Sequence, residues 1–104
     1  MATPTTRSLK HLRELGYTAE VVERFNSFTK RRHDLFGFID ILAIKEGEIL
    51  GVQTTSGSSV SSRIKKITEH EHLAAVRKSG MRIEVHGWRK NAKNRYVLRV
   101  VDLS

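Results

Sequence analysis

Two hydrophobic segments joined by a short glycine-containing turn constrain the fold of this chain more than any other feature. They read FGFIDILAI and ILGVQTT, at residues 36–44 and 49–55, and the turn between them is KEGE. Both segments are rich in residues that favour strands, and Gly47 supplies a residue suited to a tight turn. The pattern therefore predicts a β-hairpin that carries Asp40 in its first strand and Gln53 near the end of its second.

The polar residues of this hairpin lie symmetrically about its turn. Pairing of the two strands brings Asp40 beside Gln53, with both side chains on the same face of the sheet. The Asp40 carboxylate, the Gln53 amide oxygen and the backbone carbonyl of Thr54 are oxygen donors of the kind that Mg²⁺ prefers. Polar groups at strand ends are also common without a ligand. The spacing alone therefore leaves a metal site and an ordinary structural role both open.

The periodicity of the remaining chain places the hairpin in an α/β domain. Leucines at helical spacing before Gly16 predict a first helix, and serine caps followed by apolar residues three and four apart predict a second one that stops at Gly80. Since the chain has 104 residues, we expect one domain over residues 1–104, with a mixed sheet flanked by helices. The expected elements are a helix from Thr5 or Thr6 to Gly16, a strand over 17–24, a basic loop over 26–33, the hairpin, a helix over 59–78, and strands over 81–88 and 95–103, with a basic loop over 89–94 between the last two.

The balance of charged residues is strongly basic. Lys and Arg together number 19 against 11 Asp and Glu, which gives a net charge of +8. A small domain of this charge usually meets a polyanion, and the clustering of the basic residues favours a nucleic acid over a protein that is basic for other reasons. The residues that we expect to contact phosphate groups are Lys30, Arg31, Arg32, Arg63, Lys65, Lys66, Arg89 and Lys90.

The order of elements, together with the stretch GFIDILAIKEGEILGVQTTS, resembles the PD-(D/E)XK nuclease superfamily, and within it the archaeal Holliday junction resolvases and related phage-encoded proteins. Over about residues 5–80, LRELGY is similar to the first helix–strand junction of the family, Asp40 to its motif aspartate, and QTT at 53–55 to its Glu-X-Lys triplet. The resemblance implies a restriction-endonuclease-like fold of αβββαβ order. It also implies a metal-dependent DNA endonuclease, structure- or junction-selective, with Mg²⁺ as cofactor and Mn²⁺ as a substitute.

Several positions depart from the pattern of that family. Gln53 stands where the family has an acid, and Thr55 stands where it has the lysine that orients or polarises the attacking water. The first helix often carries a glutamate in the family and reads TTRS here. We expect Glu23, at the end of the first strand, and Asp34, just before the second, to compensate. The candidate catalytic residues are Asp40, Gln53, Glu23, Asp34 and Thr55, and the candidate metal ligands are Asp40, Gln53 and Thr54.

These departures leave three functions open: an active DNA endonuclease, a catalytically inactive DNA-binding module on a nuclease fold, and an RNA-associated basic domain. The resemblance also implies a homodimer, because two DNA strands need two sites; the aliphatic residues of the last strand either form that interface or belong to the core. The chain has no cysteine, which excludes disulfides and fits a reducing compartment. With no membrane-spanning run and no signal peptide, we expect the cytoplasm of a bacterial or phage-infected cell.

Overall fold

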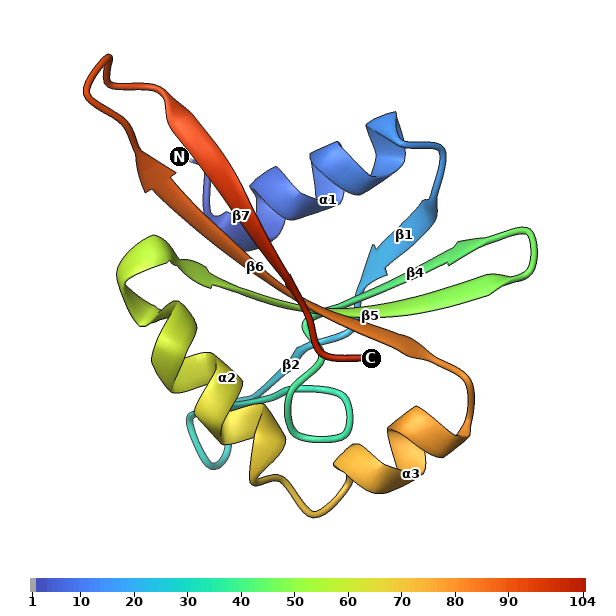
Figure 1. Cartoon of the computed structure of the whole chain (residues 1–104). Helices are drawn as coiled ribbons and strands as arrows, with labels where there is room; N and C mark the ends of the chain where they lie inside the picture. The colour runs from blue at the N-terminus through green and yellow to red at the C-terminus, as the bar shows by residue number, and fades with distance from the viewer. Residues whose placement is uncertain (1) are drawn as a thin grey trace.

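A mixed five-stranded sheet forms the centre of the molecule in the computed structural model, which describes residues 2–104 (Figure 1). The strands of this sheet are β1 (Thr18–Val21), β4 (Ile41–Lys45), β5 (Glu48–Ser56), β6 (Arg82–Lys90) and β7 (Tyr96–Asp102). Their order across the sheet is β1-β4-β5-β6-β7, and only β5 and β6 run parallel to each other. The α/β class and the mixed sheet expected from the sequence are therefore confirmed.

Helices cover both faces of the sheet and enclose two hydrophobic cores. Helix α1 (Pro4–Glu14) packs on one face, while α2 (Val60–Thr68) and α3 (Leu73–Lys78) pack on the other, after a short turn η1 (Gly57–Ser59). Among residues 2–104, no helix is long and apolar enough to cross a membrane. The α1-side core consists of Leu12, Ala19, Ile41, Ala43, Leu50 and Val52. The α2-side core consists of Phe38, Ile39, Val60, Ile67, Leu73, Val76, Ile83 and Val85.

The predicted hairpin is present as β4 and β5. Ile41 pairs with Val52, and the backbone N–H of Asp40 donates to the Val52 carbonyl at 2.8 Å. Gly47 in the turn has φ of 75°, which is the left-handed region that glycine tolerates best. This register confirms that Asp40 and Gln53 lie side by side.

The first strand of the hairpin begins later than the sequence suggested. Residues 35–39 form a tight loop closed by a bridge between Leu35 and Ile39. Phe36 and Gly37 have φ values of 54° and 85°, and a chain in this left-handed region cannot continue as an extended strand. Phe38 and Ile39 are nevertheless fully buried. The loop therefore anchors the chain in the core immediately before Asp40.

In place of the single helix expected over residues 59–78, the structure has two helices, α2 and α3, separated by residues 69–72. The backbone N–H of His72 donates to Nδ1 of His70 at 3.1 Å, an interaction that competes with a helical hydrogen bond. The His70 ring packs edge-on against Phe38, and a Cβ added at Gly37 would lie 2.2 Å from its Nε2. The helix break thus lets His70 cover the loop before β4.

Residues 24–33, expected as the end of a strand and a basic loop, form a hairpin of their own. The first strand of the sheet ends at Val21, and a separate two-stranded sheet pairs β2 (Arg24–Asn26) with β3 (Arg31–His33). The Asn26 side chain closes the turn by accepting hydrogen bonds from the N–H groups of Phe28 and Thr29, at 2.9 and 3.3 Å. The polar sequence of residues 24–33 therefore forms a hairpin arm that is separate from the main sheet.

The last two strands differ from expectation mainly in where they end. β6 continues through Arg89 and Lys90, which were expected in a loop. β7 lies at the edge of the sheet, where Val101 packs against the α2-side core while Val97 and Val100 are exposed. Its aliphatic residues therefore serve the core in part, and the homodimer stays a prediction.

Candidate metal centre

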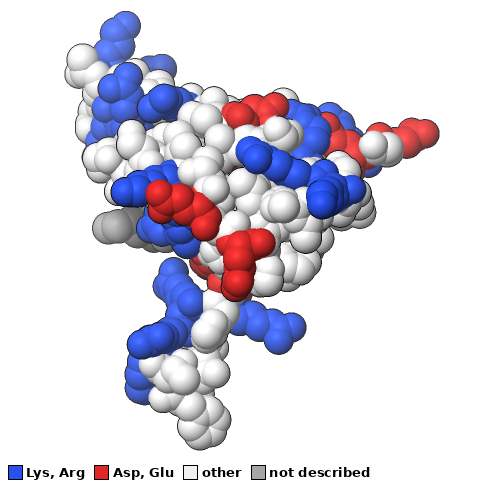
Figure 2. All heavy atoms as spheres, turned by 60° about the horizontal axis from the view of Figure 1, so that its bottom comes forward, with Lys and Arg blue, Asp and Glu red and all other residues white. Residues whose placement is uncertain are grey.

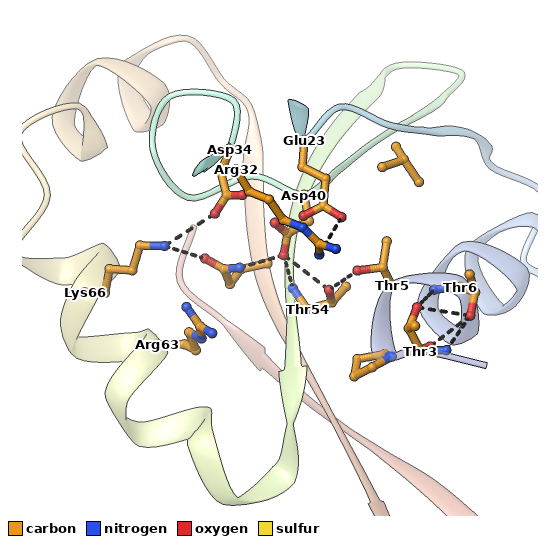
Figure 3. A pocket seen from close by; sticks show the side chains of 13 residues that line it. Thr3, Thr5, Thr6, Glu23, Arg32, Asp34, Asp40, Thr54, Arg63 and Lys66 are labelled. Carbon is orange, nitrogen blue, oxygen red and sulfur yellow. Dashed lines mark hydrogen bonds and ion pairs between the residues drawn. The ribbon is translucent and has the colours of Figure 1, made fainter. Parts of the chain in front are cut away.

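Three carboxylates converge where β4 begins (Figure 3). Asp40 immediately precedes β4, and Glu23 and Asp34 immediately flank the β2–β3 hairpin. The hydrogen bond from the Val22 N–H to the Asp40 carbonyl, 2.8 Å long, holds the start of the hairpin against the start of β4. One oxygen from each of the three acids lies within 4.8 Å of the others. Oxygen donors in such a group suit a hard divalent cation, so the cluster is able to hold a metal ion.

Asp40 is the buried member of this cluster, and hydrogen bonds fix its orientation. Its Oδ2 accepts bonds from Gln53 Nε2 at 2.6 Å, from the Thr54 N–H at 2.8 Å and from Thr54 Oγ1 at 3.2 Å. The Thr54 hydroxyl in turn lies 2.8 Å from the hydroxyl of Thr5, in the first turn of α1. The side chain of Asp40 is therefore positioned by β5 and indirectly by α1.

The surroundings of Asp40 favour its protonated form in the metal-free protein. Burial raises its pKa from the ordinary 3.8 to about 7; the Thr54 N–H opposes this rise, and the Asp34 carboxyl and the Glu23 charge add to it. Three negative charges in one pocket repel one another, so near neutral pH the cluster retains a proton. A divalent cation removes this repulsion and competes with that proton.

We expect the metal-free protein to lose stability as the pH rises from about 4 to about 8. Because the pKa of Asp40 is about 7 when folded and near 3.8 when unfolded, the folded state holds a proton that the unfolded state has released. The contribution of this group is full below pH 4 and is lost as the pH rises through 7, on the order of a few kcal/mol. Urea unfolding in EDTA across this pH range measures it.

The Asp40→Asn variant is the control for this pH dependence, since other groups titrate in the same range. The variant has no carboxyl to deprotonate at this position, so its free energy of unfolding should change less with pH. The two proteins should diverge progressively between pH 5 and 8. A constant difference between them over that interval would show that Asp40 has an ordinary pKa.

Basic side chains approach the acidic cluster from two sides. Lys66 of α2 places its Nζ 3.4 Å from Asp34 Oδ2, and Arg32 of β3 places Nη1 3.9 Å from Glu23 Oε1. Within residues 2–104, Asp40 has no basic partner within 4.0 Å. Arg63, one helical turn before Lys66, faces the same pocket (Figure 3). The cluster is thus acidic at its centre and basic at its rim.

Gln53 and Thr55 occupy different environments on β5. Gln53 Nε2 donates to Asp40, while its Oε1 lies 3.5 Å from Lys66 Nζ. An amide oxygen facing the carboxylate would be repelled, so these partners fix the direction of the amide. Gln53 therefore acts here as a hydrogen-bond donor to Asp40, and its oxygen is engaged by Lys66. Thr55 is buried and does not line the pocket of the acids.

The acids lie in an open pocket of about 750 Å³. One wall is the N-terminal turn of α1, including Thr3 and Thr5; Thr3 caps the helix by accepting a hydrogen bond from the Thr6 N–H at 3.1 Å, the role expected of Thr5 or Thr6. The N-terminus of a helix carries a partial positive charge that favours anions. The pocket therefore combines carboxylates with groups suited to a phosphate.

The predicted nucleic-acid contacts lie in several places. Arg32, Arg63 and Lys66 line the pocket, and Lys65 is exposed on α2. Lys30 and Arg31 are exposed on the β2–β3 hairpin, which forms the narrow basic arm at the bottom of Figure 2, with acidic side chains near its base. The remaining two, Arg89 and Lys90, are exposed at the end of β6 and do not line this pocket.

Sequence reasoning missed two features of this pocket. Thr5 contributes a hydroxyl from the first turn of α1, and it meets Thr54 across 49 positions of the chain. Lys66 was expected only as a phosphate contact, yet it reaches Asp34. Arg63 and Lys66 are three residues apart, and that spacing on a helix was a signal that both face one side.

A second polar network, beneath α1, links a serine, a histidine and a glutamate in the same sequence of contacts as a hydrolase catalytic triad. Ser8 Oγ lies 3.0 Å from His86 Nδ1, and His86 Nε2 lies 2.9 Å from Glu84 Oε1. Ser8 and His86 are only 0% and 1% exposed, so no substrate reaches this serine. Trp88 also donates to Ser8 Oγ, at 2.8 Å. The network joins α1 to β6, and its burial suits a structural role rather than a catalytic one.

Comparisons with known proteins find no match: neither the protein-family models nor the curated proteins contain one for this chain. The class of protein therefore rests on the fold and the site alone. The molecule is an α/β protein with a mixed five-stranded sheet, flanked by helices, and an acidic cluster at the start of β4 that is able to hold a metal ion.

Proposed function

We propose that this chain is a divalent-metal-dependent DNA endonuclease on a restriction-endonuclease-like form of the α/β fold. The observation that carries the proposal is the convergence of Glu23, Asp34 and Asp40 in a pocket whose rim holds Lys66 and Arg32. Carboxylates suit a hard cation, and the basic rim suits a phosphate backbone. The net charge of +8 supports a nucleic-acid partner.

The donor set fits Mg²⁺ or Mn²⁺. In octahedral coordination with bonds of about 2.1 Å, ligand oxygens are about 3.0 Å apart when adjacent and about 4.2 Å apart when opposite. The three carboxylate oxygens lie within 4.8 Å of one another, so rotations of the side chains would bring them onto one ion. When bound, such an ion supplies a Lewis acid for the phosphate and lowers the pKa of a bound water.

Residues in and around the pocket have distinct roles in the proposed reaction. Asp40 is the central ligand, and Gln53 and Thr54 hold it in place through hydrogen bonds. Lys66 supplies a positive charge beside the acids, as the family's lysine would from the position of Thr55. A fixed cation of this kind stabilises the charge that develops on a scissile phosphate. Arg32 and Arg63 contact the flanking phosphates, and the N-terminus of α1 adds its partial charge.

The rival function is a catalytically inactive DNA-binding module on the same fold. Two observations favour it: Gln53 brings no negative charge to the cluster, and its oxygen is engaged by Lys66. A weak metal site would still leave the basic rim and the arm in place for binding. An RNA-associated domain is the third candidate, carried only by the overall charge.

A cleavage assay separates these functions. Labelled single-stranded DNA, duplex DNA, a four-way junction and a matched RNA are incubated with Mg²⁺, Mn²⁺ or EDTA at one salt concentration. We expect DNA products with metal and none in EDTA, and Glu46→Gln, an exposed acid in the β4–β5 turn, should cleave normally. Salt-sensitive binding without products would indicate the inactive module, and tighter binding of RNA than of DNA would indicate the third function.

A further inference from the structure

The β2–β3 hairpin carries exposed aromatic residues that the proposed chemistry does not use. Phe28, in the turn, is 96% exposed, and Phe25, on β2, is 62% exposed. Neither belongs to a hydrophobic core. Single exposed apolar residues are common on proteins, but these two lie on one narrow arm that projects from the body (Figure 2).

Basic residues share this arm with the two rings. Arg24, Lys30, Arg31 and Arg32 all lie within the hairpin and are exposed. Phe25 pairs directly with Arg32 across the two strands, so the two side chains leave the hairpin on the same face. Aromatic rings interleaved with basic side chains are the arrangement that binds single-stranded nucleic acid, by base stacking and phosphate contact.

The arm is joined to the acidic cluster at both ends and has a defined tip. Glu23 immediately precedes β2, and Asp34 immediately follows β3. The Asn26 side chain holds the turn by accepting hydrogen bonds from the N–H groups of Phe28 and Thr29. Because Phe28 is five positions from Glu23, the Cα atoms of the two residues lie at most about 17 Å apart, the length of about five stacked nucleotides.

We propose that the β2–β3 hairpin is a base-stacking arm: Phe28 stacks on an unpaired base of the DNA, within about five nucleotides of the phosphate held at the acidic cluster. This inference rests on the proposed function for its partner, and it adds a substrate class, DNA with unpaired nucleotides beside the cleavage position. A base inside a continuous duplex has both faces covered by its neighbours, so an uninterrupted duplex offers Phe28 no free face.

Binding to oligonucleotides in EDTA tests the arm without any cleavage. The probes are a single strand and a forked duplex carrying 2-aminopurine in the unpaired region, and a continuous duplex of the same sequence. Wild-type protein should quench the fluorescence of the unpaired 2-aminopurine and bind these probes more tightly than the duplex. Phe28→Ala should weaken single-strand binding about tenfold and abolish the quenching, with less than about a twofold effect on duplex binding.

Three further variants show whether stacking is the cause. Phe28→Trp keeps a stacking ring and should restore both readouts, whereas Phe28→Leu keeps apolar character without a ring and should not. Ile49→Ala removes an exposed apolar residue of the β4–β5 hairpin, 49% exposed, and should bind all probes as wild type does. Rescue by Phe28→Leu, unchanged binding by Phe28→Ala, or an equal loss on the duplex would each overturn the proposal. So would Phe28-dependent binding to vesicles of anionic lipid without quenching of the oligonucleotides.

The binding and cleavage assays together distinguish failure of the base-stacking proposal from failure of the nuclease proposal. Quenching that depends on Phe28, together with no cleavage in any metal, would leave the arm standing and remove the enzyme. Metal-dependent cleavage with no role for Phe28 would support the enzyme and overturn the base-stacking arm. If wild-type protein binds none of the DNA probes in EDTA and cleaves none of them with metal, both proposals fail.

Discussion

Replacing Asp40 with asparagine should reduce metal-dependent cleavage by at least about 100- to 1,000-fold. The variant keeps the shape of the side chain and an oxygen that accepts the hydrogen bond from the Thr54 N–H, but it removes the charge that binds the cation. Loss of electrostatic stabilisation at a reacting group commonly costs this much in rate. Single-turnover cleavage of the preferred DNA at saturating protein measures the loss.

The same substitution should make the metal-free protein more stable at pH 8. The Asp40 carboxylate is buried and faces two other acids, and its pKa of about 7 records the cost of charging it there. Urea unfolding in EDTA should show a higher midpoint for Asp40→Asn than for wild type, with Glu46→Gln unchanged. Cleavage that survives in Asp40→Asn would contradict the role of Asp40, while a lower midpoint would contradict the repulsion among the acids.

Replacing Lys66 with alanine should lower kcat by about 100-fold with a smaller change in KM. Its Nζ lies beside Asp34 and Gln53, so under the proposed function its charge acts at the attacked phosphate rather than along the length of the DNA. Lys66→Arg should recover part of the rate, because it keeps the charge with a different shape. Steady-state cleavage at several DNA concentrations separates the two constants.

Lys65 is the matched control for Lys66. It is the neighbouring lysine on α2 and is exposed, so Lys65→Ala should change only the salt-sensitive affinity for DNA. Equal effects of the two substitutions on kcat and KM would mean that Lys66 is simply one more phosphate contact. The proposed role of Lys66 in place of a family lysine would then fail.

The parts of the molecule that the sequence predicted correctly depend on local patterns. The alternation and the glycine turn of the β4–β5 hairpin are local, and they were enough to place Asp40 beside Gln53. The first helix was predicted from leucines at helical spacing within it. Glu23 and Asp34 were nominated because they lie near strand ends, although nothing in the sequence showed that a hairpin between them would bring them together.

The features that the sequence did not predict depend on contacts between distant residues. The break between α2 and α3 accompanies the packing of the His70 ring over Gly37, 33 positions earlier (70 minus 37). Thr5 meets Thr54 only after α1 has packed on the sheet. The β2–β3 hairpin has strands of three residues each, too short for the alternation that identifies longer strands.

The most direct test of the account is to locate Mn²⁺ by anomalous scattering in a crystal grown with DNA that carries a non-cleavable backbone. We predict one peak bonded to carboxylate oxygens of Glu23, Asp34 and Asp40, at about 2.1–2.3 Å, and its loss in Asp40→Asn. An acidic cluster without a peak at millimolar Mn²⁺, while DNA occupies the pocket, would contradict the metal centre and leave a DNA-binding protein.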